Sequence, residues 1–416
     1  MKHLSFLIAA LVISSCNNKP TAEEKQKLDS SESKVVNNSD TLPPPYATKS
    51  AQKPSNEIGW PADKTPVAPE GFAVSRFAEG LQHPRWIYVA VNGDVFVSQA
   101  NNENSADNIL LFRDANKDGT AESKSIFLSG LNMPLGMLIQ NDKFYVANND
   151  ALMEYPYAAG APSMKAQGKK IVSLPGGPRH WARNVIASKN GEKFYISVGA
   201  ASNVAENGID KEEGRALILE VNKDGSGQRV YASGLRNPVG MDWAPGTNVL
   251  WTAVNERDEL GDDMPVDYLT SVQEGGFYGW PYAYWGKNED PRLKGQRPDL
   301  VQKSIKPDVS LGAHTASLGL AFYTKESFPE KYRGGAFVGQ HGSWNRSKFS
   351  GYKVVFVPFA DGRPSGNAED FLTGFIANED KSEVYGRPVG VAIAADGSLL
   401  VADDGGNIIW KVSYKK

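Results

Sequence analysis

Residues 234–255 read GLRNPVGMDWAPGTNVLWTAVN, which is two short apolar runs separated by a proline–glycine turn. Short apolar runs that are bounded by turn residues are typical of β-strands. The first run follows the phrase GLRNP, and the second ends at a polar residue, Asn255. We interpret the stretch as two consecutive β-strands.

Both parts of this stretch recur along the chain. Copies of the first part begin at residues 80, 130, 316 and 385, as GLQHPRWIYVA, GLNMPLGMLIQ, ASLGLAFY and YGRPVGVAIA, and a degenerate copy, HWARNVIA, begins at residue 180. Copies of the second part follow a few residues later, as DVFVSQ, KFYVANN, KFYISVG, GAFVGQH and SLLVADD. Each unit also carries further strand-like runs. Four short strands every ~50 residues are typical of the blades of a β-propeller.

Six such units predict an all-β fold, a six-bladed β-propeller that occupies residues 66–416. The last unit ends in IIWKVSY and has one strand too few, whereas the strand-like run GFAVSRFAEG, residues 71–80, precedes the first unit. Pairing these two runs would close the ring and remove its open edge. A sandwich or a barrel would not show this period, so we prefer the propeller.

The first 16 residues combine a lysine, an apolar run and small residues before Cys16, the only cysteine of the chain. The apolar run is too short to span a membrane and fits a secretory signal peptide. Its end resembles a bacterial lipobox, which implies lipidation of Cys16, export, and a membrane-anchored lipoprotein facing the periplasm or the cell surface. An ordinary cleaved signal is the alternative. Residues 17–65 are polar and contain several prolines, so we expect a flexible tether.

An insertion rich in charged and aromatic residues follows the quoted stretch. Residues 255–263 form an acidic loop, and residues 275–286 read GGFYGWPYAYWG. Oxygen donors, the pair Arg236 and Asn237, and aromatic rings together suit a metal ion beside a planar anionic ligand. A long loop that packs its own aromatic rings is an equal alternative. The net charge of −3 and the lack of a basic stripe argue against nucleic acid as a partner.

Several candidate site residues fall at equivalent places in the repeats. His180, Arg236, Asn237 and Arg387 lie at or just before the first strand of their units. In a propeller these strands line the central channel, and the loops at one end form a shared pocket. We therefore expect these side chains to converge on one site.

Six stretches of the chain resemble the sorbosone dehydrogenase family, which is related to the soluble glucose and aldose-sugar dehydrogenases that use pyrroloquinoline quinone (PQQ). They are RHWARNVIA, GLRNPVGMDWAP, VNERDELGDDMPVDYL, GGFYGWPYAYWG, FPEKYRGGAFVGQHGSWNRS and YGRPVGVA. The resemblance extends over about residues 69–414. It implies a six-bladed propeller that binds PQQ and Ca²⁺ and oxidises a sugar or a sugar-derived alcohol or aldehyde. Hydride would pass to the quinone with help from a general base, and electrons would pass to an external acceptor such as a quinone or a cytochrome.

The resemblance also implies roles for particular residues. His180 matches the family's base, and Arg236 would stabilise charge on the quinone oxygen, so both would be catalytic. The cofactor-binding residues would be Arg236, Asn237, His341, Arg346, Arg387 and Asn132. The metal site would involve Glu256, Arg257 and Asp262. Calcium-dependent relatives have Gly-Pro where this chain has Glu256 and Arg257, which leaves the ligand atoms open.

Two other functions remain open at this point. One is a propeller that binds glycans or partner proteins without catalysis, and the other is a lactonase-like propeller in which calcium activates an ester. A tricarboxylate needs cations that a lactone does not, so His180, Arg236 and Arg387 favour the dehydrogenase. Separately, the segment DANKDGTAE from Asp114 resembles the start of an EF-hand loop, but Ser125 stands where that loop needs a glutamate. We predict a hairpin turn there.

Overall fold

Short strands make up most of the regular structure in the computed structural model, which describes residues 42–101, 105–116 and 118–415. All of these residues belong to one unit, Val35–Lys416. The predicted signal peptide with Cys16, and residues 17–41 of the predicted tether, lie outside the described residues. Within the described part, no helix is both long and apolar enough to cross a membrane.

Six sheets among the described residues contain four or five strands each, in the order of the predicted repeats. The first three sheets consist of β3 (Pro84–Val89), β4 (Val95–Gln99), β5 (Asn108–Arg113) and β6 (Ser123–Leu128); β7 (Met137–Gln140), β8 (Lys143–Asn148), β9 (Ala151–Pro156) and β10 (Lys169–Ser173); and β11 (Arg183–Ala187), β12 (Lys193–Val198), β13 (Leu217–Asn222), β14 (Arg229–Ser233) and β18 (Gly276–Phe277). The other three consist of β15 (Pro238–Trp243), β16 (Leu250–Val254), β17 (Val266–Ser271) and β21 (Val309–Ala313); β22 (Ser317–Phe322), β23 (Ala336–Gln340), β24 (Lys353–Val357) and β27 (Glu369–Leu372); and β30 (Pro388–Ile393), β31 (Leu399–Asp403), β32 (Ile408–Tyr414) and β2 (Phe72–Ala78).

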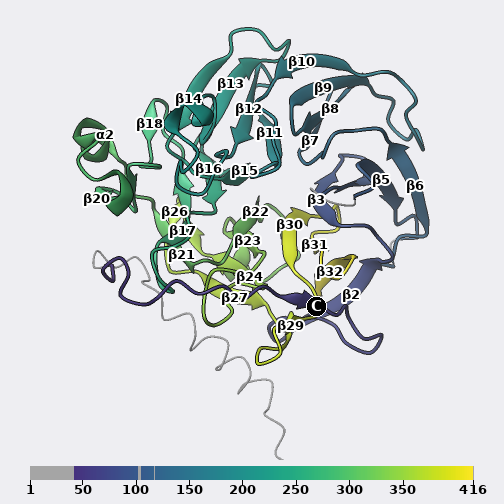
Figure 1. Ribbon diagram of the computed structural model, residues 1–416. Coiled ribbons are helices and arrows are strands. Elements are labelled where there is room, and N and C mark those ends of the chain that lie inside the picture. The colour runs from purple at the N-terminus through teal and green to yellow at the C-terminus, as the bar shows by residue number, and fades with distance from the viewer. Residues whose placement is uncertain (1–41, 102–104, 117, 416) are drawn as a thin grey trace, which may run out of the picture. The chain divides into compact units, whose positions relative to one another are not determined.

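The first strand of each sheet lies innermost, and these inner strands pack against one another around a ring. β15 contacts β11 and β22, β30 contacts β22 and β3, and β7 contacts β3 and β11. Figure 1 shows the ring viewed along its axis, with the inner strands near the centre and β2, β6 and β10 toward the outside. This is the propeller arrangement, with the strands of the first repeated phrase around the central channel.

Glycines in the repeated phrase allow the inner strands to approach so closely. A Cβ atom on Gly240 would lie 2.6 Å from the carbonyl oxygen of Leu318, and one on Gly319 would lie 2.1 Å from that of Val389. A Cβ atom on Gly390 would lie 2.5 Å from the carbonyl oxygen of Arg85 in the same way. Because real Cβ atoms do not approach backbone this closely, only glycine fits at these positions.

The ring closes through strands from the two ends of the described chain. β2 pairs antiparallel with β32, from Phe72 opposite Tyr414 to Ala78 opposite Ile409. This is the pairing predicted between residues 71–80 and IIWKVSY. It gives the last sheet its fourth strand, and it removes the open edge that β32 would otherwise present.

The acidic loop of the predicted insertion lies between β16 and β17, and the aromatic part separates β17 from β21, the third and fourth strands of one sheet. It contains β18, the pair β19 (Ala283–Tyr284) and β20 (Asn288–Glu289), and the helix α2 (Pro298–Lys303). Its large rings are buried, with relative exposures of 0% for Tyr278, 3% for Trp280 and 4% for Trp285. These aromatic rings therefore pack into the protein interior. This agrees with the second interpretation given above, a long loop that packs its own rings.

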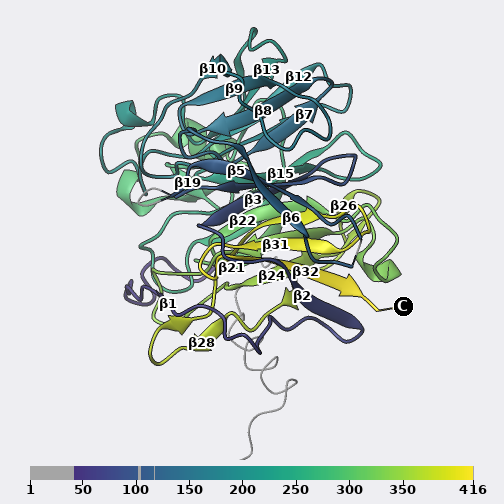
Figure 2. The same cartoon turned by 90° about the vertical axis from the view of Figure 1, so that its right-hand side faces the viewer.

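Residues 42–65 lie against the ring of sheets, so the prediction of a flexible tether up to residue 65 is wrong for this part. β1 (Asn56–Glu57) pairs in parallel with β29 (Glu383–Val384), which also pairs with β28 (Ile376–Asn378). Trp60 packs against Phe375, Tyr385 and Trp410. Figure 2 shows β1 and β28, the two outer strands of this small sheet, at the lower left of that view. One half-buried tryptophan and a strand pairing stabilise a segment whose overall composition is polar.

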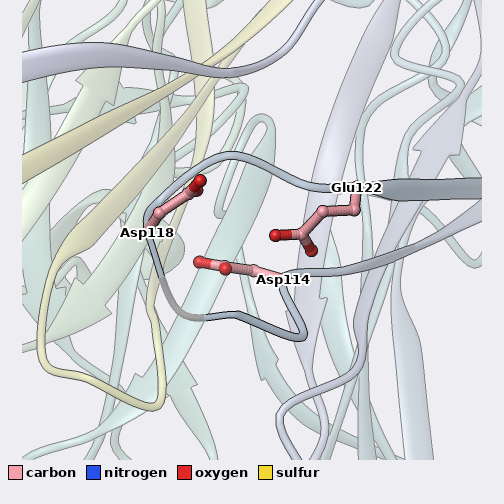
Figure 3. Close-up of side chains that lie close together, drawn as sticks. All are labelled: Asp114, Asp118 and Glu122. Carbon is pink, nitrogen blue, oxygen red and sulfur yellow. The ribbon is translucent and has the colours of Figure 1, made fainter.

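The segment that begins at Asp114 joins β5 and β6, which pair antiparallel, so it is the predicted hairpin connection. Figure 3 shows that the carboxylates of Asp114, Asp118 and Glu122 lie close together there. They accept hydrogen bonds from amides of the same hairpin, such as those from Gly119 to Asp114 (3.0 Å) and from Thr120 to Asp118 (2.8 Å). The acidic residues thus support the turn itself.

Candidate functional site

We call the end of the ring at which the inner strands begin the mouth. The segments that lead into β11, β15 and β30 place His180, Arg236 and Arg387 there. A continuous path of contacts joins the last two, through His341, Ala316, Thr315, Asp267 and Glu256. On the other side of the ring the Arg85 guanidinium lies over the Trp181 ring, 5.3 Å from its centroid. The segments that carry His180, Arg236 and Arg387 thus lie at the same end of the ring, and a shared ligand site there remains a prediction.

Arg236 is buried, and its guanidinium ties the acidic loop to the rest of the mouth. Its Nε donates to the carbonyl oxygen of Asn203 (3.0 Å), and one terminal nitrogen donates to the carbonyl oxygens of Asn255 (3.2 Å) and Glu256 (2.8 Å). The other terminal nitrogen donates to the side chain of Asn203 (2.9 Å) and lies 3.6 Å from Asp258. Burial lowers the pKa of Arg236, and nearby carboxylates oppose this effect. The side chain therefore links the loop that contains Asn203 to the acidic loop.

Two buried side-chain oxygen atoms near Arg236 lack a hydrogen-bond partner within the described part of the chain. They are Oδ1 of Asn237 and Oε2 of Glu256. Burial raises the pKa of Glu256 to about 7. Buried polar atoms without partners are rare in native proteins and require an explanation, such as a missing ion or ligand. Oxygen atoms of this kind are the ligands that hard divalent cations prefer.

His180 is held as a neutral base in a strained turn. Its backbone has a φ of 42°, in the left-handed region that non-glycine residues seldom adopt. Its Nδ1 donates to the carbonyl oxygen of Ala200 at 2.8 Å, so in the neutral ring Nε2 carries the free lone pair. Burial and the positive charges of Arg236, Arg179 and Arg183 lower the pKa of His180 well below its usual value. The imidazole can therefore accept a proton through Nε2 at neutral pH.

Two neighbours explain how the His180 turn keeps this shape. A Cβ atom on Gly199 would lie 2.7 Å from the Cβ of His180 and 2.4 Å from Oδ1 of Asn237, so glycine is required there. Arg183 is fully buried and donates to the carbonyl oxygens of His180 (2.5 Å), Ala182 (2.9 Å) and Pro175 (2.7 Å). Arg183 therefore orients the turn through backbone carbonyls.

A second group of charges, Arg85, His341 and Asp404, lies at the same mouth. Asp404 accepts hydrogen bonds from Arg85 and from Nε2 of His341 (2.8 Å). Burial would raise the pKa of Asp404, but His341, Arg85 and Arg387 outweigh it and hold this pKa well below its usual range. Burial and Arg387 lower the pKa of His341 to about 4. At neutral pH the group therefore contains a carboxylate, a neutral imidazole and at least one guanidinium.

Arg387 contacts this group through backbone atoms. Its Nε donates to the carbonyl oxygen of His341 (3.1 Å), and a terminal nitrogen donates to that of Gly342 (3.0 Å). The other terminal nitrogen lies 3.4 Å from Glu57. Each terminal nitrogen of an arginine carries two N–H donors, so one donor on each is still available to a ligand.

The remaining predicted residues differ in what they contact. Arg257 forms a buried ion pair with Asp290 (2.5 Å). Arg346 donates to the carbonyl oxygen of Asp262 (3.1 Å), and the Asp262 carboxylate accepts hydrogen bonds from Ser347. Arg346 and Asp262 thus contact each other and fix the acidic loop from outside.

Asn132 and Lys353 lie apart from the charged groups of the mouth. Asn132 is exposed in the turn before β7, where its carbonyl oxygen accepts a hydrogen bond from Asn149 (2.9 Å). Lys353, at the start of β24, pairs with Asp370 at 2.7 Å. The structure shows no contact that links either side chain to His180 or Arg236 within the described residues.

Sequence reasoning missed four residues that build the mouth. Arg85, Asn203, Asp258 and Asp404 hold the predicted residues in place, and a fifth, His314, accompanies them. Both ring nitrogens of His314 face acceptors, Asp258 (3.2 Å) and the carbonyl oxygen of Gly261 (2.8 Å). Burial would lower the pKa of His314, but these acceptors outweigh it and raise this pKa. Position within the repeat was the available signal for Asp404. It directly follows the second strand of its sheet, as His341 and Asn255 directly follow the second strands of their sheets.

A cavity of about 860 Å³ lies away from the mouth. It is lined by the turn between β15 and β16 at Thr247, by Trp251 and Asp308, and by the hairpin of β25 (Phe359–Ala360) and β26 (Arg363–Pro364). The turn after β15 is at the opposite end of this inner strand from Arg236. None of the predicted site residues lines this cavity.

We expect the two histidines with lowered pKa values to remain neutral in mildly acidic solution. A model histidine titrates near pH 6.5, about half protonated there. A pKa below that value means that the ring takes up its proton only after the pH has fallen further. In an NMR titration of the histidine-labelled apo-protein, the His180 and His341 ring signals should shift below pH 6.5. Glutamine variants assign the signals, since the chain has 5 histidines. A His180 signal that titrates at or above pH 6.5 would contradict the neutral base.

A family model described as TrAA12-like matches residues 66–295 and 299–415. The chain belongs to the TrAA12-like family. The short unmatched segment lies at the start of α2, in the insertion between β17 and β21. The match covers the whole ring of sheets except for this part of the insertion.

Relatives of this TrAA12-like chain include sugar dehydrogenases. An uncharacterised protein of Borreliella burgdorferi is 30% identical over 361 residues, which cover 84% of this chain and 90% of that protein. The pyrroloquinoline quinone-dependent pyranose dehydrogenase of Coprinopsis cinerea is 25% identical over 395 residues, which cover 80% of this chain and 52% of the fungal protein. The chain thus spans about half the length of that dehydrogenase.

The solved PQQ domain of the Coprinopsis cinerea pyranose dehydrogenase, in its holo form, has the same fold as this TrAA12-like chain. The TM-score is 0.71 at 22% identity, and the match covers 86% of this chain and 98% of that domain. The part of the fungal protein that corresponds to the ring of sheets is thus its PQQ domain.

Proposed function

We propose that this protein is a PQQ- and calcium-dependent dehydrogenase that oxidises a sugar or a sugar-derived alcohol or aldehyde and passes the electrons to an external acceptor. The observation that carries the proposal is His180, a neutral histidine with a free Nε2, held beside Arg236 at the mouth of a TrAA12-like propeller. Pyranose dehydrogenase and the other sugar dehydrogenases among the relatives support the substrate class.

The residues of the mouth fit a flat tricarboxylate. Arg85, Arg236 and Arg387 come from three separate sheets and supply positive charge. Arg387 keeps open donors, and Nε of Arg85 is buried with no hydrogen-bond partner among the described residues. Trp181, next to His180, offers a ring with a relative exposure of 9%. Cations and an aromatic wall are what a planar polyanion requires.

The buried oxygen atoms of Asn237 and Glu256 fit a divalent cation. Their atoms Oδ1 and Oε2 are buried and lack a hydrogen-bond partner among the described residues. A calcium ion there would lower the pKa of Glu256 and balance the charge of its carboxylate, since a nearby cation favours the ionised form. We propose that these two side chains, rather than the carboxylate of Asp262, contribute ligand atoms.

When bound, PQQ supplies the acceptor for the hydride that leaves the substrate carbon. Nε2 of His180 takes the proton of the substrate hydroxyl, so that the carbon–hydrogen bond breaks as the carbonyl forms. The hydrogen bond from Nδ1 to Ala200 keeps the ring in the required tautomer. Arg236 presents a fixed positive charge where negative charge develops, and its position costs no reorganisation during the reaction.

The proposal is tested by reconstitution. Purified apo-protein is titrated with PQQ in the presence of Ca²⁺, and binding is followed by tryptophan fluorescence. Dye reduction is then measured with pyranoses, aldoses and sorbosone. Saturable binding together with PQQ-dependent dye reduction is the expected result. If PQQ does not bind in the presence of Ca²⁺, the proposal is overturned.

We also propose that the protein is exported and is anchored to a membrane by lipid on Cys16. The support is the sequence of the first 16 residues. Mass spectrometry of the mature N-terminus would show a diacylglyceryl cysteine if the proposal holds, and an unmodified Cys16 would overturn it.

A further inference from the structure

Residues 42–64 form a segment that we call the strap, because it runs along the edge of the mouth from the acidic loop to β29. In Figure 1 it is the purple segment that precedes β2 and leads to β29. The strap first contacts three consecutive residues of the acidic loop. The amide of Tyr46 donates to the carbonyl oxygen of Leu260 (2.7 Å), the amide of Asp262 donates to Oγ1 of Thr48 (2.7 Å), and the amide of Gly261 donates to Oγ of Ser50 (3.2 Å). The loop that holds Glu256 is therefore fixed from outside by the strap.

The strap next contacts the loop after β23. The amide of Lys53 donates to the carbonyl oxygen of Trp344 (2.7 Å), and Nδ2 of Asn345 donates to that of Ala51 (2.9 Å). Oδ1 of Asn345 in turn accepts from the amide of Glu259 (2.9 Å) in the acidic loop. Asn345 thus links the strap to the same loop a second time.

The last part of the strap reaches Arg387 from two directions. Glu57, on β1, pairs with a terminal nitrogen of the guanidinium at 3.4 Å. The indole of Trp60 donates to Oδ2 of Asp403 (2.7 Å), and Oδ1 of the same carboxylate accepts from the amide of Arg387 (2.7 Å). Asp403 is fully buried and also accepts a hydrogen bond from the indole of Trp410 (3.0 Å), so the Trp60 indole is one of several donors that fix its position. Both the backbone and the side chain of Arg387 are therefore held by strap contacts.

We propose that the strap positions the cofactor-binding residues of the mouth: Thr48 and Ser50 position the acidic loop, and Glu57 and Trp60 position Arg387. This inference rests on the proposed function, because it assigns the strap a part in binding PQQ and calcium. The strap residues are positioning residues, since they touch Arg387, Asp403 and the loop rather than the ligand. A packing segment with no such part would stabilise the fold without changing ligand affinity.

The first test uses the full chain with the double substitution Glu57→Gln and Trp60→Phe. These changes remove one ion pair and one indole hydrogen bond. The first keeps the shape of the side chain, and the second keeps a smaller aromatic ring, as does the tryptophan substitution in the control. The matched control is Glu274→Gln with Trp243→Phe, which removes one exposed ion pair to Arg229 and one indole bond to Ala187 away from the mouth. We expect exchange of the Arg387 amide in the apo-protein to become about tenfold faster in the strap variant only.

The second test addresses the acidic loop. Thr48→Val with Ser50→Ala removes the acceptors of two loop amides. The control Thr247→Val removes the acceptor of the Val249 amide at the other end of β15. Exchange at Gly261 and Asp262 should become about tenfold faster, with melting temperatures close to that of the control.

Affinity for PQQ in the presence of Ca²⁺ is then measured for all variants. Both strap variants should bind about 5- to 30-fold more weakly than the unmodified protein, and the controls should bind normally. If the unmodified protein binds PQQ and the strap variants match the controls in affinity, the proposal is overturned. If the unmodified protein does not bind PQQ, the proposed function fails. The faster exchange would then still support the positioning of Arg387 and the loop.

Discussion

Replacing His180 by glutamine is expected to lower kcat of the PQQ-loaded protein by about 10²- to 10⁴-fold, the usual contribution of a general base. Glutamine fills a similar volume and its amide can still donate to the carbonyl oxygen of Ala200. It has no lone pair of comparable basicity to place where Nε2 lies. The loss should therefore appear in kcat, with PQQ affinity nearly unchanged, when dye reduction is measured under saturating substrate.

His341→Gln is the matched comparison, because His341 is also half-buried at the mouth and also has a lowered pKa. Its Nε2 is engaged with Asp404, so its loss should weaken PQQ binding more than it lowers kcat. The two histidine variants would then separate proton transfer from cofactor binding. A His180→Gln protein with kcat within tenfold of the unmodified protein would assign the base to another group.

The ring of sheets could be predicted because each repeat contains the sequence signals of its own strands. The phrase that ends in Gly240 or Gly390 recurs at each inner strand, and the same glycines allow the close approach of neighbouring strands. Pairing of residues 71–80 with the last strand followed from counting strands. Position within the repeat likewise placed His180, Arg236 and Arg387 at one end. These features depend on periodicity, which a single sequence displays.

Contacts between side chains of different sheets could not be predicted in the same way. Asp404 looked like one of several aspartates, and its role follows only from Arg85 and His341, which are distant in sequence and close in space. The composition of the aromatic insertion suited a ligand-binding loop. In the structure Tyr278 and Trp285 are buried, because burying large apolar rings is more favourable than leaving them exposed to solvent. Composition also misled at Trp60, because a single anchored tryptophan orders a segment that is polar on average.

Replacing Arg236 by methionine is expected to cost about 3–5 kcal/mol of unfolding free energy, as removal of one partner from a buried charged group does. The carbonyl oxygens of Asn203, Asn255 and Glu256 would lose their donor in a buried place. Asp258 would keep His314 but lose its second positive neighbour. Urea denaturation of the apo-protein measures this cost without any cofactor.

Arg229→Met is the control for this substitution. Arg229 also pairs with carboxylates, Glu220 and Glu274, but its side chain is 44% exposed. Surface pairs contribute about 0–1 kcal/mol, so its loss should have little effect. Arg236→Lys keeps the charge, but its three donors lie on a single nitrogen atom. That atom cannot bind the Asn203 loop and the acidic loop at the same time. It should therefore recover only part of the stability. If Arg236→Met costs no more than Arg229→Met, the guanidinium does not hold the two loops together, and the geometry around Glu256 must be maintained by its other contacts, such as the one from its amide to Asp267.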